Sequence, residues 1–328
     1  MEALRKLPIQ LDTELVSNEE DKHGTDASCG PGPEPWGFVI GHGLRSVQLH
    51  STLSGDLLVC LVYHDARLRC LRHGERLLGE SGDEHRWTAA AQRFREALQE
   101  AILESGVHGC VDVVGRWKRR RLVVERDYVI ERFPLADGHV WEYQQPEGQF
   151  SNPNAPCEVH CLDWLCNEAA EIRRSCGPEP LRLLELHCGG GNNTVALAPY
   201  FDEIVAVEIN RVLASAAEAN LQANGIQNVR LVRAPSAMAE ESAAYISRSS
   251  SSAAQAVLVD PPRSGLDDET REIVARFSNI LYISCNPDAL ARDLRILHCS
   301  HRAISFAVFD MFPYTTHAEC AVRLVKTS

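Results

Sequence analysis

The chain has 328 residues, with 33 Lys and Arg against 45 Asp and Glu, so its formal net charge is −12. Hydrophobic residues make up 45% and charged residues 24%, which excludes a wholly disordered or fibrous protein, and the length suggests about two domains. No run approaches the ~18 apolar residues of a membrane helix. The polar, acidic start of the chain is unlike a targeting peptide. We therefore expect a soluble, cytoplasmic protein with no membrane partner, with an organellar location left open.

The first part of the chain predicts a tail followed by a small domain. Residues 1–40 are polar and rich in turn formers, which predicts a loosely ordered tail. Residues 41–145 predict a smaller α+β region, because short apolar runs alternate there with one amphipathic segment. The predicted strands are 57–63, 109–114 and 121–124, and the predicted helix is 87–103.

Two basic stretches are candidate nucleic-acid surfaces. Charge runs are most often solvated surface, and the acidic total argues against wholesale binding of nucleic acid, so these stretches alone leave RNA contact open. The first stretch contains Arg116, Lys118, Arg119, Arg120, Arg121, Arg126 and Arg132, and the second contains Arg292, Arg295 and Arg302.

Residues 146–328 predict an α/β domain. Short apolar runs alternate with helical segments, the pattern of βαβ units in a mostly parallel sheet. The last run follows by a short connection without a helix and is expected to add an antiparallel strand. The segment Ser247–Ser252 is expected to be a flexible loop. The predicted strands are 181–186, 203–209, 228–232, 256–260, 280–284, 304–309 and 318–325.

A glycine turn follows the first of these strands. Gly189 and Gly191 stand between a strand and a helix, where glycine lets the backbone approach a ligand. Glu208 ends the next strand, at the spacing from which an acid accepts hydrogen bonds from a ribose diol. The third glycine of the dinucleotide pattern is missing, since Thr194 stands in that region. The pattern favours binding of a nucleoside cofactor, and it favours S-adenosylmethionine over NAD. The alternative interpretation is that the glycines form a turn with a purely structural role.

Three further motifs carry reactive side chains. Asp260 begins DPPRSGL at a strand end, where open α/β sheets bind ligands. Cys285 lies between a strand and a helix that Asn286 is expected to cap, and the helix dipole there would lower the pKa of the thiol and favour a nucleophilic thiolate. Glu319 and His317 precede the last strand, and either is a candidate base.

A metal site is not expected. Cys157, Cys161, Cys166 and Cys176 have spacings that fit no common zinc pattern, and the first two lie one helical turn apart. Thiols packed in a helix are the default interpretation.

Together these motifs resemble the tRNA (uracil-5-)-methyltransferase family, in its bacterial-type tRNA/tmRNA branch. The resemblance extends from about Ser51 to the C-terminus. It implies a class I S-adenosylmethionine-dependent methyltransferase domain, Rossmann-like, preceded by the smaller α+β RNA-binding region. The motifs are VVGRWKRRRLVVERDYVIERFPL, QFSNPNA, LELHCGGGN, VAVEIN, DPPRSGL, YISCNP and FDMFPYTTHAEC.

The resemblance also implies an activity and the residues that carry it. The expected reaction is S-adenosylmethionine-dependent methylation of uridine C5 in RNA, at the T-loop uridine of tRNA, through a covalent bond from Cys285 to C6 of the base. Glu319 would be the base that removes the C5 proton. No metal is expected. Cofactor contacts are implied for Asn152, His187, Asn192, Glu208 and Asp260 beside the glycine turn, and substrate contacts for Phe150 and Arg263.

Departures from the family pattern and rival functions remain. Asn152 stands where the family usually has Gln, one methylene longer, and His187 where it has Tyr or Phe. The rivals are the same chemistry on ribosomal RNA, an RNA chaperone that does not need catalysis, and more distantly an NAD-dependent oxidoreductase. The partner is expected to be tRNA. A monomer is expected, although the sequence does not determine the oligomeric state.

Overall fold

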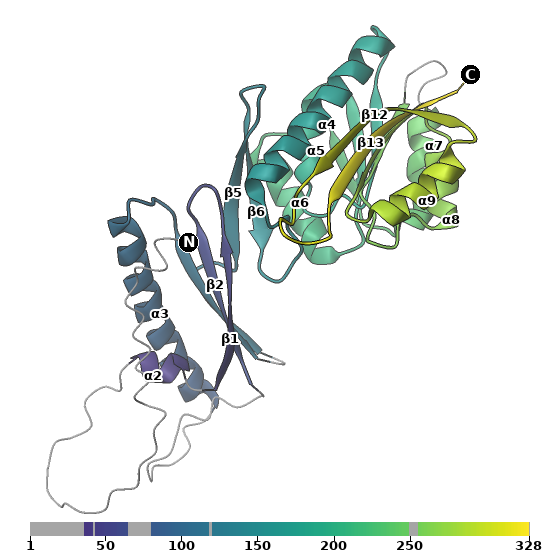
Figure 1. The fold of residues 1–328 in the computed structure, drawn as a ribbon. Coiled ribbons are helices and arrows are strands. Elements are labelled where there is room, and N and C mark those ends of the chain that lie inside the picture. The colour runs from purple at the N-terminus through teal and green to yellow at the C-terminus, as the bar shows by residue number, and fades with distance from the viewer. Residues whose placement is uncertain (1–35, 42, 65–79, 118–119, 249–254, 328) are drawn as a thin grey trace, which may run out of the picture. The chain divides into compact units, whose positions relative to one another are not determined.

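The computed structural model describes residues 36–41, 43–64, 80–117, 120–248 and 255–327. They belong to two compact units, Met1–Val129 and Ile130–Ser328, each of which has its own sheet (Figure 1). Among the described helices, none is long and apolar enough to cross a membrane.

The N-terminal unit is a four-stranded sheet with a long helix on one face. Its strand order is β1-β2-β3-β4, with β2 and β3 parallel and the two outer pairs antiparallel. The parallel pairing follows from the chain, because α3 carries it from the end of β2 back to the start of β3. The elements are α2 (Trp36–Gly41), β1 (Leu44–Ser51), β2 (Leu57–Tyr63), α3 (Glu80–Glu104), β3 (Val111–Trp117) and β4 (Arg120–Val124).

Three aromatic side chains join the helix to this sheet. Trp87 of α3 is fully buried, and its indole N–H donates to the Tyr63 hydroxyl at 2.9 Å. Its ring meets those of Tyr63 and Trp117 edge-on, while those two rings stack on each other. Gly115 makes room for this packing, since a Cβ there would lie 2.4 Å from the Trp87 ring. The predicted helix is therefore a core element, and it begins seven residues before the predicted start at residue 87.

The prediction of a loosely ordered tail over residues 1–40 is wrong for its last residues. Trp36–Gly41 is helical, contacts α3, and buries Val39 and Ile40 in the core of the unit. The remainder of the tail, residues 1–35, lies outside the described residues. Strand β1 was not predicted, because the structure leaves most of its side chains exposed and the strand therefore has no apolar alternation.

A hairpin stands at the boundary between the two units. It is formed by β5 (Tyr128–Pro134) and β6 (Val140–Pro146). Strand β6 is bonded to α6, because Asn220 and Asn224 accept from the backbone N–H groups of Gln144 and Glu142 at 2.7 and 3.0 Å. The C-terminal unit, which begins at Ile130, includes most of this hairpin, whereas the sequence placed the domain boundary after it, at 145/146.

The C-terminal unit is a seven-stranded sheet of order β12-β13-β11-β10-β7-β8-β9. Only β13 runs antiparallel to its neighbours, as expected from its short connection. This confirms the predicted mostly parallel α/β fold. The strands are β7 (Arg182–Leu186), β8 (Glu203–Val207), β9 (Val229–Val232), β10 (Gln255–Val259), β11 (Asn279–Ser284), β12 (His301–Phe309) and β13 (Glu319–Lys326).

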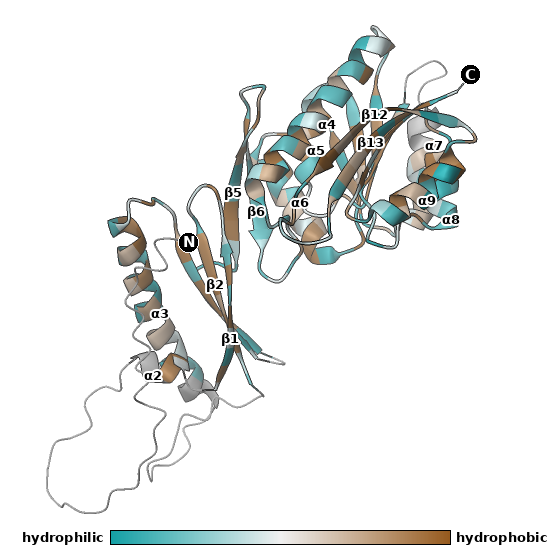
Figure 2. Ribbon diagram, viewed as in Figure 1, coloured by the Kyte–Doolittle hydropathy of each residue, from teal (hydrophilic) through white to brown (hydrophobic). Residues whose placement is uncertain are grey.

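Helices cover both faces of this sheet, so its central strands are apolar on both sides. In β7, Leu183 packs into the core under α4 and α5, while Leu184 packs into the opposite core with α7, α8 and α9. Figure 2 shows the central strands in brown, the colour of hydrophobic residues. The helices are α4 (Ala155–Cys176), α5 (Asn192–Leu197), α6 (Arg211–Ala223), α7 (Glu240–Arg248), α8 (Asp268–Val274) and α9 (Pro287–Leu297), with short 3₁₀ turns at Ala198–Tyr200 and Ser236–Met238.

The predicted flexible loop Ser247–Ser252 falls partly outside the described residues. Its first two residues end α7, and positions 249–254 are not described.

Candidate active site

The carboxyl ends of the parallel strands open onto one cavity of about 600 Å³ in the C-terminal unit. Parallel strands bring their carboxyl ends to the same edge of a sheet, and ligands of open α/β folds bind at that edge. Of the predicted site residues, only Gly191 does not line this cavity. Those that do are Phe150, Asn152, His187, Gly189, Asn192, Glu208, Asp260, Arg263, Cys285 and Glu319.

The glycine turn is open toward the cavity. A Cβ placed on Gly189 or Gly190 would meet no atom within 4 Å. Gly189 also has φ +57°, a backbone conformation that glycine adopts without strain. Gly191 differs, since its Cβ would lie 3.2 Å from Ala217 of α6, so this glycine serves helix packing.

Glu208 holds the glycine turn to the end of β8. Its Oε2 accepts from the Gly189 N–H at 2.9 Å and its Oε1 from the Asn210 N–H at 2.6 Å. Each carboxylate oxygen has a second lone pair, so both remain able to accept from a ligand. His187 lies beside it, in a left-handed backbone conformation at φ +63°, and burial lowers the pKa of its imidazole.

The register of β11 and β13 brings the two predicted catalytic residues together. Ser284 pairs with Cys320 across this antiparallel pair, so Cys285 and Glu319 occupy the next opposing positions. Asn286 caps α9 by accepting from the Asp288 N–H, as its sequence position predicts. Its amide also donates to the Arg263 carbonyl at 2.8 Å, which ties the Cys285 turn to the DPPRSGL loop.

The thiol is less acidic than the sequence suggested. Burial raises the pKa of Cys285, and the carboxyls of Glu319 and Asp260 raise it further, while Arg263 opposes them. The expected lowering by the helix dipole is therefore wrong for the ligand-free site. A local dipole is worth little against two nearby acids in a partly desolvated cavity.

Three acidic side chains share the cavity with the thiol. Burial raises the pKa of Glu319 to about 8, and that of Glu158 and Asp260 to about 7 each, with mutual repulsion contributing for Glu319 and Asp260. Glu158 lies in the first turn of α4 and was missed by sequence reasoning. A signal existed: it shares the buried face of α4 with Leu162 and Leu165, where an acid is unusual.

His317, the alternative candidate base, already accepts a hydrogen bond from the chain. An Arg263 guanidinium N–H donates to its Nδ1 at 3.0 Å, and a guanidinium can only donate. His317 also meets the Phe312 ring edge-on. The carboxyl of Glu319 forms no hydrogen bond or ion pair with the described residues, so Glu319 is the better candidate base. Phe150 stands at the rim with 75% of its surface exposed, where a base could stack on it.

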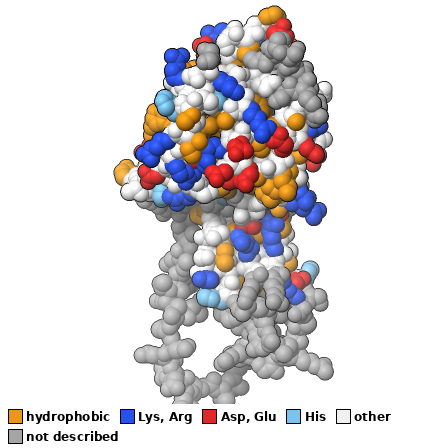
Figure 3. Space-filling view, turned by 90° about the vertical axis from the view of Figure 1, so that its right-hand side faces the viewer, with side chains coloured by type: hydrophobic (Ala, Val, Ile, Leu, Met, Phe, Trp, Pro, Cys, Tyr) orange, Lys and Arg blue, Asp and Glu red, His pale blue; other side chains and the backbone are white. Residues whose placement is uncertain are grey.

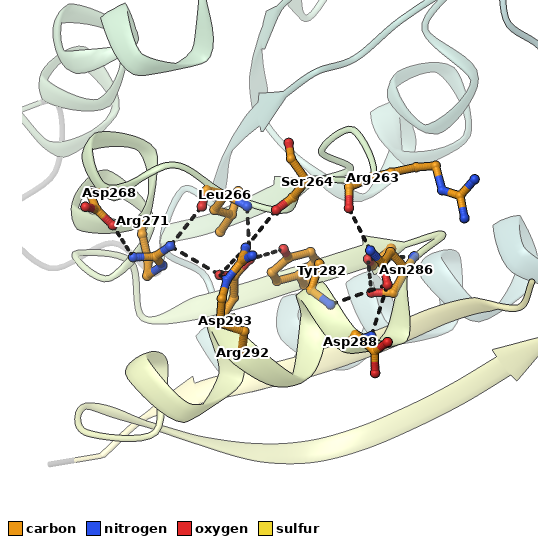
Figure 4. A network of polar contacts seen from close by, with 12 residues as sticks. Arg263, Ser264, Leu266, Asp268, Arg271, Tyr282, Asn286, Asp288, Arg292 and Asp293 are labelled. Atoms are coloured by element: carbon orange, nitrogen blue, oxygen red, sulfur yellow. Dashed lines mark hydrogen bonds and ion pairs between the residues drawn. The ribbon is translucent and has the colours of Figure 1, made fainter.

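A polar network behind the cavity fixes the DPPRSGL loop against α9 (Figure 4). Asp293 is fully buried and accepts from the Leu266 N–H at 2.9 Å and the Tyr282 hydroxyl at 2.7 Å. Arg271 and Arg292 neutralise it, and Arg292 also donates to the Ser264 carbonyl. Contacts to the Ser264 carbonyl and the Leu266 N–H therefore fix the loop that follows Asp260 against α9.

Most described arginines of the first predicted basic stretch form ion pairs within the chain, and in the second stretch Arg292 pairs with Asp293. Arg126 pairs with Asp56 and Asp112, and Arg132 with Glu142 at 2.7 Å. The view in Figure 3 shows basic and acidic side chains side by side over the face that carries part of the C-terminal unit. Two further pairs are Arg120–Glu84 and Arg121–Asp127, and Lys118 and Arg119 lie outside the described residues.

No group of three or more His, Cys, Asp or Glu side chains in the described part of the chain is arranged to hold a metal ion. Cys157 and Cys161 lie on α4, one turn apart, and Cys161 is buried in the core beneath the sheet.

Comparisons with known proteins show which family the chain belongs to. The family model for tRNA (uracil-5-)-methyltransferase matches residues 39–327. A tRNA/tmRNA (uracil-C(5))-methyltransferase of Aromatoleum aromaticum is 38% identical over 86% of this chain and 70% of its own length. One from Shewanella amazonensis is 37% identical over 88% of this chain and 73% of its own length.

A solved structure shares the fold. The tRNA (uracil-54, C5)-methyltransferase of Pyrococcus abyssi, in complex with S-adenosyl-L-homocysteine, superposes with a TM-score of 0.56 at 19% identity. The match covers 86% of this chain but only 60% of that one, so this chain spans less than two thirds of the archaeal protein. Fold, family model and bacterial relatives agree, and the chain belongs to the tRNA (uracil-5-)-methyltransferase family.

Proposed function

We propose that this chain methylates C5 of a uridine in tRNA, with S-adenosylmethionine as methyl donor, Cys285 as nucleophile and Glu319 as base. The observation that carries the proposal is the register of β11 and β13, which sets a thiol and a carboxyl side by side on the cavity that the glycine turn also lines. Membership of the family supports the same reaction.

The cavity suits the methyl donor. Gly189 and Gly190 leave open space against their backbone, and Glu208 beside them retains acceptor capacity for a ribose diol. Asn152, His187, Asn192 and Asp260 would complete the cofactor contacts. When bound, the cofactor supplies an electrophilic methyl group.

The residues of this chain must make C5 reactive, because C5 of a neutral uracil is a poor nucleophile. The Cys285 thiolate adds to C6, and the electrons of the C5=C6 bond move onto C5 and the C4 carbonyl, giving an enolate that takes the methyl group. Glu319 then removes the proton from C5, the double bond re-forms, and the thiolate leaves.

The protonation states of the free site fit this order of events. Cys285 has a raised pKa, so it is mainly a neutral thiol until a positive charge enters the cavity. A cationic methyl donor would favour ionisation of both Cys285 and Glu319, since it offsets the repulsion among the acids. The pKa of Glu319, about 8, then falls toward the range in which the carboxylate can act as a base.

The N-terminal unit is proposed as the RNA-binding region. Its arginines form several internal ion pairs, so a phosphate would have to compete with acids such as Asp127 for them. A target uridine in a folded loop must leave its stack to reach Cys285, and the exposed Phe150 ring offers a stacking surface at the rim.

The test is methyl transfer from labelled S-adenosylmethionine to unmodified tRNA and to ribosomal RNA, followed by nucleoside analysis. We expect 5-methyluridine in tRNA alone. Cys285→Ala should abolish both the product and the covalent complex with 5-fluorouridine tRNA, in which fluorine blocks removal of the C5 substituent. Methylation of ribosomal RNA alone, or full turnover by Cys285→Ala, would overturn the proposal.

A further inference from the structure

The short side chain of Asn152 has a partner that the family pattern does not assign. Asn152 lies on the loop before α4, and its amide Nδ2 donates to Oε2 of Glu158 in the first turn of that helix. Glu158 is 2% exposed, yet it lines the cavity together with Asn152. The loop and the helix thus present one joined polar unit to the ligand.

The contact fixes which end of the Asn152 amide faces the cavity. An ionised carboxylate can only accept hydrogen bonds, so the NH₂ group of Asn152 must point at Glu158. The carbonyl oxygen Oδ1 is then turned away from Glu158, and no described group donates to it. The side chain of Asn192 also acts on Glu158, because it lowers the pKa of this carboxyl and so opposes the effect of burial.

This end of the cavity carries negative charge without a matching cation. Glu158, Asp260 and Glu319 all line it, and Glu158 raises the pKa of both other acids by repulsion. No lysine or arginine of the described residues forms an ion pair with any of the three. Glu319 is 6% exposed, and its carboxyl forms no hydrogen bond or ion pair with the described residues. Such a site favours a ligand that brings both positive charge and N–H donors.

We propose that Glu158 is a positioning residue for the cofactor: it orients Asn152 so that Oδ1 faces the cavity, and with its own charge it favours binding of the ammonium group of the cofactor's amino-acid part. This inference rests on the proposed function, because it takes S-adenosylmethionine as the ligand. An ammonium supplies three N–H donors and one positive charge, which matches an amide carbonyl oxygen beside buried carboxylates. The adenosine part would meet Glu208 and the glycine turn instead.

Two neutral thioethers separate this role from a structural one. S-adenosylhomocysteine retains the ammonium, whereas 5′-methylthioadenosine has the same adenosine and sulfur without the amino-acid group. Calorimetric titration of the full chain, without RNA and above the Glu158 pKa of about 7, gives both affinities. In Glu158→Gln we expect S-adenosylhomocysteine to bind about tenfold or more weakly, the range of a lost charged hydrogen bond. Binding of 5′-methylthioadenosine should stay within about twofold, well below the ~1.4 kcal/mol of a tenfold change.

Two further variants make the test specific. Glu171→Gln removes an equal charge from the exposed side of the same helix and should change neither affinity. If Glu158 acts partly through Asn152, the double variant Asn152→Ala, Glu158→Gln should cost less than the sum of the single variants. Unchanged melting temperatures would show that these variants are folded.

The outcomes are distinguishable. Equal weakening of both thioethers by Glu158→Gln, or no weakening of S-adenosylhomocysteine, would overturn the role of Glu158 while leaving the proposed function in place. Additive effects of the two substitutions would overturn the coupling to Asn152. If the unmodified chain bound S-adenosylhomocysteine no better than 5′-methylthioadenosine, the ammonium site would be refuted, and binding of neither would refute the proposed cofactor itself.

Discussion

In the N-terminal unit, the buried carboxylates of Asp56 and Asp112 both face the guanidinium of Arg126, at 3.2 and 2.8 Å. In the C-terminal unit, Glu158, Asp260 and Glu319 line one cavity, and no described Lys or Arg forms an ion pair with them. In the first arrangement each buried carboxylate has a cationic partner, so the removal of one partner would leave buried charge less well compensated. The second leaves negative charge without a cationic partner in a cavity, an arrangement that is typical of functional sites.

The comparison predicts that an acid of the C-terminal unit matters for turnover and not for folding. Glu319→Gln should lower turnover by about 10²–10⁴-fold, the usual contribution of a positioned base, while the melting temperature stays equal or rises. The methylated covalent complex should accumulate on ordinary tRNA, because the C5 proton cannot leave. Gel analysis of the protein–RNA complex measures this accumulation, and rapid product release from the variant would contradict the base assignment.

The reverse is expected for an acid of the N-terminal unit. Asp112→Ala leaves Arg126 with Asp56 alone and removes the acceptor of the Arg126 backbone and Nε N–H groups, so it should destabilise the protein by about 3 kcal/mol, the range of two lost hydrogen bonds to a charged group. Chemical denaturation followed by tryptophan fluorescence measures the free energy of unfolding. Cofactor affinity of the folded variant should be unchanged. Equal stability of Asp112→Ala and the parent chain would remove the contrast between the units.

The unmatched acids also predict how stability depends on pH. The pKa of Glu319 rises from its ordinary 4.5 to about 8, so the folded state holds a proton that the unfolded state has lost. Stability from this group is fully present below pH 4.5 and is lost as the pH rises through about 8. Glu185, buried in β7 with a pKa raised to about 8, acts in the same direction.

The measurement is thermal unfolding across this range without cofactor. The free energy of unfolding should fall by at least about 1 kcal/mol between the two limits, and the slope should be shallower in Glu319→Gln. Saturating S-adenosylmethionine should also flatten the curve, since a cation in the cavity stabilises the ionised acids. A stability that rises with pH over this interval would contradict the unmatched arrangement.

The smallest expected effect concerns the thiol. Burial and the neighbouring acids raise the pKa of Cys285, so its alkylation by iodoacetamide should need a higher pH than that of an ordinary cysteine. Removing one acid in Glu319→Gln should move the midpoint of the alkylation profile downward by less than about one unit. Mass spectrometry of the Cys285 peptide measures this, with the exposed Cys299 as internal control. An upward shift in the variant would show that Glu319 does not act on the thiol.

Many strands and helices could be predicted from the sequence, because each depends on the pattern of a few neighbouring residues. Leu57–Tyr63 is a strand at the predicted positions, and the seven strands of the larger sheet all lie where short apolar runs stand. An edge strand such as β1 has no such signal, since its side chains face water on both sides. The helical end of the expected tail became apparent only from its packing, because Val39 and Ile40 are buried in a core that other elements build.

The sequence by itself determined the α/β pattern, the open glycine turn, and the positions of Cys285 and Glu319 before or after strands, because each depends on a few neighbouring residues. Only the tertiary structure decided that Gly191 packs against α6, that Glu158 reaches the cavity and holds Asn152, and that the thiol is less acidic than its helix position suggests. These facts depend on burial and on charges from distant segments, and free energies of desolvation cannot be assigned until it is known which groups share a space without water.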